Sequence, residues 1–255
     1  MKPGVVLFSV AVCFLAGCSK PEPEKVAPKA APPVVYFKVD PTTPGVLTGK
    51  VLFTGKKPPR TPISMEGEAK CASLHKGVVY DESVIVNRNG TLSNAFVYIK
   101  EGLEGKTFEP PTTPVIINQS GCSFSPRVFG IQTGGVLHVT NSDPVTHNIH
   151  LIAQNNREWN QSQAPGEPVL ERKIGRPEVM IRVKCNVHSW MRAYMGAVSH
   201  PYFAVTGVDG SFEIRNVPPG DYTIEAWQEK LGTQETRVTL ASSGKSEAVF
   251  AFKGE

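Results

Sequence analysis

The 255-residue sequence lacks the features that mark several common protein classes. It contains no Cys-x-x-Cys-His motif, so covalently attached haem is not indicated. Its formal net charge is only +4, and basic and acidic residues are interspersed. No lysine or arginine block therefore indicates a nucleic-acid partner. No segment shows a sustained 3.6-residue apolar repeat, which argues against long amphipathic helices.

The first 17 residues have the pattern of a targeting segment. The apolar run at residues 5–16 is too short and wrongly flanked for a membrane-spanning helix. It ends in LAGC at residues 15–18, which resembles the lipobox of bacterial lipoproteins. The resemblance implies a signal peptide over residues 1–17 and lipidation of Cys18. An ordinary secretory signal peptide is the alternative.

Residues 18–44 are rich in proline and read as a tether. Such a segment cannot bury enough apolar surface to fold, and it favours extended geometry. With the lipobox, it predicts a protein of the cell envelope that faces the periplasm and contacts the membrane through its N-terminal lipid. By family analogy, Ser19 after the lipidated cysteine suggests the outer membrane of a Gram-negative host.

The chain beyond residue 45 is predicted to be all-β. Short apolar and β-branched runs are separated by turn residues such as glycine, proline and asparagine. Many short strands at this spacing are typical of β-sandwiches or barrels, and the length favours two domains. The expected strands are 46–53, 83–87, 95–100, 115–119, 136–141, 148–152, 179–184, 196–199, 202–205, 211–215, 220–228, 236–240 and 247–252.

Two distant segments resemble one known β-sandwich. The sequence TGVDGSFEIRNVPPGDYTI at residues 206–224 is similar to the carboxypeptidase regulatory-like, or prealbumin-like, family. The opening strand of that family resembles TGKVLFTG at residues 48–55. We therefore predict one split sandwich over residues 45–108 and 200–255, with a second domain inserted at 109–199. Two sandwiches in tandem are the alternative.

The positions of the cysteines limit which of them can bind a metal or form a disulfide. Cys13 lies in the removed segment and Cys18 would be lipidated, which leaves Cys71, Cys122 and Cys185. If Cys185 binds a metal, the other two form an even pair in an oxidising compartment. A Cys71–Cys122 disulfide is therefore possible, although spacing alone cannot show that the two residues meet.

The sequence CNVHSWM at residues 185–191 is the strongest functional signal. It places Cys185, His188 and Met191 at successive intervals of three residues, and His147 lies upstream. Two imidazoles, one thiolate and a weak axial thioether are the ligands of a blue-copper site. Taken singly, each residue is more often ordinary packing, and zinc is an alternative occupant.

The flanking sequence resembles the cupredoxin family, in particular amicyanin and pseudoazurin. The resemblance rests on SFSPRV at residues 123–128, TGGVLHVTNSD at 133–143, HNIH at 147–150 and the loop CNVHSWMR at 185–192. It implies a Greek-key β-sandwich with one type 1 copper ion. It assigns His147, Cys185, His188 and Met191 as the copper ligands.

The resemblance also implies roles for neighbouring residues. Asn148 would tie the two ligand segments together and tune the sulfur. His188 would lie near the surface as the electron port, with Trp190 and Met195 on an apolar docking rim. Met195 is the rival axial ligand, but its spacing from His188 would need a longer ligand loop.

The cupredoxin resemblance has three departures, and four histidines lie outside its ligand set. Thr146, Ser189 and Trp190 replace residues that the family usually has as Pro, Pro and Phe. The histidines without an assigned ligand role are His75, His138, His150 and His200; we expect His150 to point away from the copper.

Copper catalysis is disfavoured by what surrounds the cysteine. A multicopper oxidase or nitrite reductase would need a further histidine beside it, whereas Lys184 and Asn186 flank Cys185. A binuclear site would need a second cysteine in the loop. The sequence therefore predicts a non-enzymatic electron carrier that cycles between Cu(I) and Cu(II), with an unidentified redox protein as partner. A periplasmic copper carrier and a metal-free binding module are the alternatives.

Overall fold

The computed structural model describes Met1 and residues 33–254, and these contain almost no helix. Residues 2–32, which include Cys18 and most of the proposed tether, lie outside the described residues. None of the helices in the described part reaches the length and hydrophobicity of a bilayer-spanning segment. Regular structure begins at Gly45. Apart from one short helix, all of its elements are strands, so the prediction of an all-β fold is confirmed.

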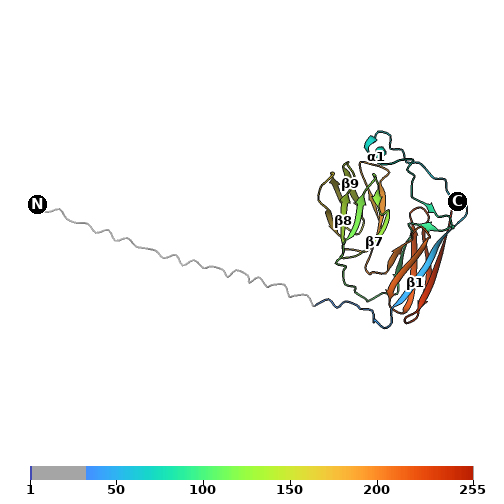
Figure 1. Ribbon diagram of the computed structural model, residues 1–255. Helices are drawn as coiled ribbons and strands as arrows, with labels where there is room; N and C mark the ends of the chain where they lie inside the picture. Colours follow the sequence, from blue (N-terminus) through green and yellow to red (C-terminus); the bar gives the residue numbers. More distant parts are fainter. Residues whose placement is uncertain (2–32, 255) are drawn as a thin grey trace. The chain divides into compact units, whose positions relative to one another are not determined.

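One pair of sheets joins strands from the two ends of the described chain. Antiparallel β15 and parallel β18 flank β1, so the first strand pairs with the last (Figure 1). The second sheet has the order β14-β4-β16-β17. The strands are β1 (Gly45–Thr54), β15 (Ser211–Val217), β18 (Lys245–Lys253), β4 (Phe96–Glu101), β14 (Phe203–Val205), β16 (Gly220–Gln228) and β17 (Gly232–Leu240).

These two sheets share one apolar core. Leu47 and Val51 of β1, Val97 and Ile99 of β4, and Ile224 of β16 belong to the same buried cluster. Alternate residues of each strand face it, as in β18, where every second residue is buried. We call this region, with its short β2–β3 ribbon (Ile85–Val86 and Leu92–Ser93), the outer sandwich.

The intervening chain forms a second sandwich, which we call the central sandwich. Its sheets have the orders β10-β9-β12-β13-β7 and β11-β8-β5-β6, and they enclose a separate core. The strands are β5 (Val115–Gln119), β6 (Phe124–Ser125), β7 (Val128–Gln132), β8 (Val136–Asn141), β9 (His147–Ile152), β10 (Trp159–Gln163), β11 (Leu170–Lys173), β12 (Glu178–Lys184) and β13 (Arg192–Val198).

The sequence patterns missed five strands, β3, β6, β7, β10 and β11, and one helix. β3 and β6 have only two residues each, and Gly130 interrupts the apolar run of β7. β10 and β11 are both edge strands with mostly polar, exposed residues, so they carry no clear apolar alternation. The helix α1 (Ala69–Ser73) is a single turn whose only buried residue is Cys71. It lies in the segment 55–81, which leaves the outer sandwich and packs Met65 and Cys71 into the central core.

The two sandwiches also contact each other directly. A third buried cluster combines Phe96 and Tyr98 of β4 with Val128 and Val198 of the central sandwich. Beside it, the guanidinium of Arg127 makes a bidentate ion pair with the carboxylate of Glu229, with N–O distances of 2.7–3.0 Å. The structured residues therefore form one continuous body from Val35 onward.

Candidate metal centre

His147 is the first residue of β9 and is fully buried. Its strand lies between β10 and β12, and its backbone is fixed opposite Gln163 in the β9–β10 register. Because alternate residues point to opposite sides of a strand, Ile149 also enters the core while His150 is partly exposed. The β-sheet itself therefore holds this imidazole at the end of the core.

Cys185 and Met191 sit at the two ends of a tight loop. Cys185 follows β12 directly and Met191 precedes β13, and the two strands are antiparallel neighbours. The backbone N–H of Cys185 donates to the carbonyl of Met191 at 3.1 Å, and the N–H of Met191 donates to the carbonyl of His188 at 3.0 Å. All three side chains are buried.

The nitrogens and the sulfur of three predicted ligands converge. Nδ1 of His147 lies 3.0 Å from Nδ1 of His188, and Sγ of Cys185 lies 3.8 Å from that same His188 nitrogen. The three donor atoms all lie within 4.8 Å of one another. The described structure therefore brings together, around one point, residues separated by up to 41 positions in the chain.

These distances match those of ligands sharing one metal ion. Two metal–nitrogen bonds of about 2.0 Å hold their nitrogens roughly 3.0–3.3 Å apart at angles from about 97° to the tetrahedral value. Metal–sulfur and metal–nitrogen bonds of about 2.3 and 2.0 Å hold the two atoms roughly 3.5–3.8 Å apart. The donor set, two imidazoles with a thiol, suits copper, so the residues present fit the ion that the sequence predicts.

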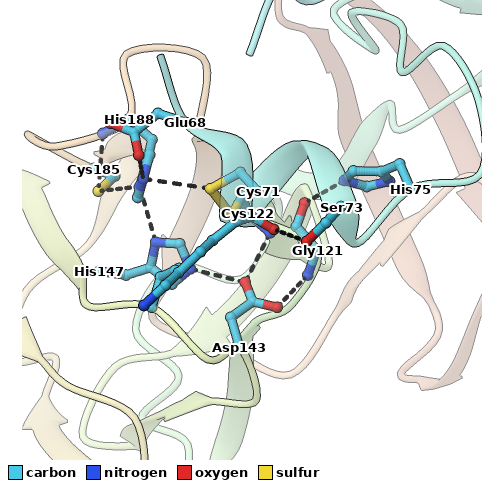
Figure 2. The surroundings of a disulfide bond; sticks show 12 residues. Glu68, Cys71, Ser73, His75, Gly121, Cys122, Asp143, His147, Cys185 and His188 are labelled. Carbon is cyan, nitrogen blue, oxygen red and sulfur yellow. Dashed lines mark hydrogen bonds and ion pairs between the residues drawn. A yellow bond between two sulfur atoms is a disulfide. The ribbon is translucent and has the colours of Figure 1, made fainter. Parts of the chain in front are cut away.

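Asp143 orients His147 from the opposite side of the ring. Nε2–H of His147 donates to a carboxylate oxygen of Asp143 at 2.8 Å. The same carboxylate accepts the backbone N–H groups of Gly121 and Cys122 at 2.6 and 2.7 Å (Figure 2). A proton held on Nε2 leaves the lone pair of Nδ1 free to bind a metal.

Burial keeps this imidazole uncharged. Desolvation lowers the pKa of His147 below its usual value of 6.5, and it outweighs the opposing effect of the Asp143 carboxylate. The contact between the two side chains is therefore a hydrogen bond from a neutral ring. A neutral imidazole is the form that binds metals.

The far edge of His188 is covered by α1 and a disulfide. Cys71 and Cys122 are disulfide-bonded, with their Cα atoms 5.6 Å apart, and the sulfur of Cys71 lies 3.5 Å from Nε2 of His188 (Figure 2). A carboxylate oxygen of Glu68 lies 3.7 Å from the same nitrogen. His188 is consequently only 2% exposed, so the expectation that its imidazole lies near the surface is wrong.

Asn148 connects the two ligand segments. Its side-chain oxygen accepts the backbone N–H of Asn186, the residue after Cys185, at 3.0 Å. Its amide also contacts the side chain of Asn160 on β10. The sulfur of Cys185 itself receives a backbone N–H, from His188 at 3.4 Å. Such hydrogen bonds orient metal ligands and tune a thiolate.

The two candidate axial methionines are both buried. Met191 belongs to the same core cluster as Cys185. Met195 lies within β13, opposite Ile181 and Phe129, and is fully buried, so its expected place on a docking rim is wrong. Trp190 is partly exposed, and its Nε1–H donates to the carbonyl of Cys122 at 3.0 Å.

The remaining histidines have partners elsewhere. His150 contacts Asn186 and Glu158 on the outer side of β9, as expected from its alternation with His147. The others contact Glu171 (His138), the carbonyl of Gly121 (His75) and the carbonyl of Ile99 (His200).

Sequence reasoning missed the residues around the two histidines. The motif at residues 133–143 ends in Asp143 but predicts no role for it; its position four residues before His147, in a loop, is the available signal. Glu68 and Cys71 carried no such signal, because only the tertiary fold brings them to His188.

Comparisons with known proteins add little beyond the fold. Domain II of polysaccharide lyase family 4 matches residues 175–249, which is less than half of the chain and does not show a family. No curated protein matches the sequence.

Several solved structures resemble part of the chain. A copper-containing nitrite reductase from Thermus scotoductus SA-01 is 21% identical at a TM-score of 0.32, covering 39% of this chain and 25% of that one. A purple cupredoxin from Nitrosopumilus maritimus is 21% identical at a TM-score of 0.28, covering 32% of this chain and 98% of that one. A Cu(I) amicyanin mutant is 12% identical at a TM-score of 0.29, covering 35% and 86%. These scores are too low to indicate function, which therefore depends on this chain's own residues.

Proposed function

We propose that this protein is an electron carrier with one type 1 copper site in the central sandwich. The ligands are Nδ1 of His147, Sγ of Cys185 and Nδ1 of His188, with the thioether of Met191 as the weak axial ligand. The observation that carries the proposal is the convergence of the first three donor atoms within 4.8 Å at the buried end of one core. Copper supplies one-electron chemistry between Cu(I) and Cu(II) when it is bound.

The protein's part is to hold the ligand geometry unchanged between the two redox states. His147 is fixed by a β-strand and by Asp143, while Cys185 and His188 are fixed by a loop closed through backbone hydrogen bonds. Burial keeps water away from all three side chains. A rigid, dry site needs little rearrangement when charge changes, which favours rapid electron transfer over catalysis.

The same burial bears on the alternative of a copper carrier. A carrier must hand its ion to a partner by ligand exchange, which an exposed donor helps. Here His188 is 2% exposed and Cys185 is 3% exposed. We therefore expect slow loss of copper to a chelator, and rapid loss would favour the carrier function instead.

The domain arrangement and the location complete the proposal. We propose that residues 45–108 and 200–255 form one domain, the outer sandwich, into which the copper domain at 109–199 is inserted. The pairing of β1 with β15 and β18 supports this arrangement. Lipidation of Cys18, the tether at 18–44 and the periplasmic location rest on the N-terminal sequence alone.

An optical spectrum of the copper-loaded protein tests the function. We expect an intense visible absorption from a Cu(II)–thiolate bond, its loss in Cys185→Ser, and its retention in His150→Gln, which alters a neighbouring histidine outside the site. Absence of the band in the wild-type protein would contradict a blue-copper site. Loss of the band in His150→Gln as well would show that folding, and not ligation, is being measured.

A further inference from the structure

A second group of metal-binding side chains lies on the opposite side of the His188 ring. The sulfurs of Cys71 and Cys122 lie within 4.8 Å of each other and of a ring nitrogen of His188. Glu68 adds a carboxylate oxygen 3.7 Å from Nε2 of His188. Figure 2 shows the two cysteines on the side of the ring away from Cys185. The group thus contains two sulfurs, one nitrogen and one oxygen.

We propose that reduction of the Cys71–Cys122 disulfide converts this group into a binding site for one thiophilic metal ion, such as Zn²⁺. The ligands are the thiolates of Cys71 and Cys122, Nε2 of His188 and the carboxylate of Glu68. This inference goes beyond the proposed electron carrier and does not depend on it, because it concerns the copper-free protein and does not use Cys185. A neutral imidazole has one nitrogen lone pair, so Nε2 of His188 binds this ion when the ring proton is on Nδ1 and no copper is bound there.

The spacing of the donors agrees with such a site. Sulfur and nitrogen ligands on one tetrahedral zinc ion are roughly 3.5–3.6 Å apart, given bonds of about 2.3 and 2.0 Å. The sulfur of Cys71 lies 3.5 Å from Nε2 of His188. Two thiolates on the same ion are roughly 3.7 Å apart. The Cα atoms of the two cysteines, 5.6 Å apart, require only a small adjustment to allow this.

Contacts independent of the disulfide keep the two cysteines near each other. Asp143 accepts the backbone N–H groups of Gly121 and Cys122, and Trp190 donates to the carbonyl of Cys122. On the other segment, Nε2–H of His75 donates to the carbonyl of Gly121 at 2.9 Å. These bonds join the loop at 120–123 to His75, two residues after α1, and to the ligand loop, so the thiols stay positioned after reduction.

Glu68 provides the route by which an ion would enter. Its side chain is 43% exposed, whereas that of His188 is 2% exposed. Glu68 and Cys71 are three residues apart at the start of α1, where the carbonyl of Glu68 accepts the N–H of Ala72. Residues at this spacing share one face of a helical turn. An ion can therefore contact the Glu68 carboxylate in solvent before it reaches the thiolates.

A dithiol reductant donates two electrons and two protons to the Cys71–Cys122 disulfide, leaving two thiols and an oxidised reductant disulfide. Binding of a divalent ion then releases the two thiol protons. Reoxidation by a thiol oxidant, with loss of the metal, restores the disulfide. The site is therefore present in one redox state only.

Cd²⁺ titration of the full chain carrying Cys185→Ser tests the proposal, because this substitution removes the thiolate of the proposed copper site. We expect the reduced variant to bind one Cd²⁺ with a thiolate-to-metal ultraviolet absorption, and the oxidised variant to bind at least 100-fold more weakly. Adding Cys71→Ser should remove the binding, and Glu68→Gln should weaken it about 10-fold.

The controls separate ligation from unfolding. Glu66→Gln alters a nearby exposed carboxylate and should leave the Cd²⁺ affinity unchanged. Circular dichroism of each reduced variant checks that the β structure is retained. Equal Cd²⁺ binding by the reduced and oxidised forms would overturn the proposal, as would binding that survives Cys71→Ser. Failure of this test would leave the visible spectrum of the copper-loaded wild-type protein unaffected.

Discussion

Buried histidines in two regions of the molecule show how similar burial can serve different ends. At the junction with the outer sandwich, Nε2–H of His200 donates to the carbonyl of Ile99 at 2.9 Å, and its Nδ1 accepts the N–H of Tyr202 at 3.2 Å. In the central sandwich, the Nδ1 atoms of His147 and His188 instead face each other and a thiol.

The difference lies in the kind of partner that each ring nitrogen has. Both nitrogens of His200 are satisfied by backbone, so the ring is a structural element. Nε2 of His147 contacts Asp143, and Nε2 of His188 contacts the sulfur of Cys71. The Nδ1 atoms of the two rings are directed at a shared point. Side-chain donor atoms that face one another, and not the backbone, are the arrangement on which the proposed copper site rests.

Copper binding is the largest expected effect, and it should act on the central sandwich alone. Free Cu(I) at about 1,000 times its dissociation constant should stabilise the folded protein by about 4 kcal/mol. Denaturant unfolding of the wild-type protein with and without Cu(I) measures this. Cys185→Ser should remove most of the gain, whereas His200→Gln should keep it. A gain of equal size in Cys185→Ser would contradict the assigned ligands.

The ion pair that joins the two sandwiches should give the next largest effect. The side chains of Arg127 and Glu229 are only 10% and 3% exposed. Glu229→Gln leaves a buried guanidinium without its counter-charge and should cost about 3 kcal/mol of stability. Glu213→Gln, which breaks the exposed pair with Arg215, should cost under about 1 kcal/mol. Equal costs for the two variants would show that the Arg127–Glu229 contact adds nothing.

The pH dependence of stability tests the junction histidine. Burial lowers the pKa of His200 from 6.5 to about 4. The unfolded chain therefore binds a proton at a higher pH than the folded one, so stability is full above pH 6.5 and falls as the pH drops towards 4. Between pH 7 and pH 5 the loss from this one group should be about 2 kcal/mol.

Comparison with His200→Gln isolates this contribution. The difference in unfolding free energy between pH 7 and pH 5 should be smaller in the variant by that amount. Identical pH profiles in the two proteins would mean that His200 is not held neutral in the fold.

The smallest effect concerns the residue that orients His147. Asp143→Asn removes the negative charge facing Nε2 and should weaken copper binding about 10-fold, or about 1.4 kcal/mol. Competition with a chromophoric Cu(I) chelator measures the affinity. Asp209→Asn, an exposed aspartate in a turn of the outer sandwich, is the matched control and should have no effect. An unchanged copper affinity in Asp143→Asn would show that Asp143 only stabilises its loop and does not orient His147 for metal binding.

The predictability of the fold followed the strength of each apolar pattern. The turn-rich spacing and β-branched runs predicted an all-β chain, and the central strands β5, β8 and β12 lie where they were expected. Edge strands β10 and β11 were missed because polar, solvent-facing residues dominate them. Local patterns report burial, and these two edge strands have little of it. β7 is a mostly buried edge strand that the patterns also missed, because Gly130 interrupts its apolar run.

The predictability of the site depended on sequence distance. Cys185, His188 and Met191 lie in one short loop, so their spacing predicts that they act together, and His147 was linked to them by its flanking motif. Cys71 and Cys122 are 51 residues apart, so the sequence indicated their disulfide only as a possibility. That their disulfide covers His188 had no sequence signal at all.

The sequence by itself determined the chemistry of the donors and the all-β class. Residue type, order and short spacing are local properties, and they are sufficient to indicate a thiolate, two imidazoles and strands that alternate. Only the tertiary structure decided that Asp143 holds His147 and that α1 covers His188. Such contacts depend on how separate strands and loops pack. This packing depends on all the core side chains together and not on any local stretch of sequence.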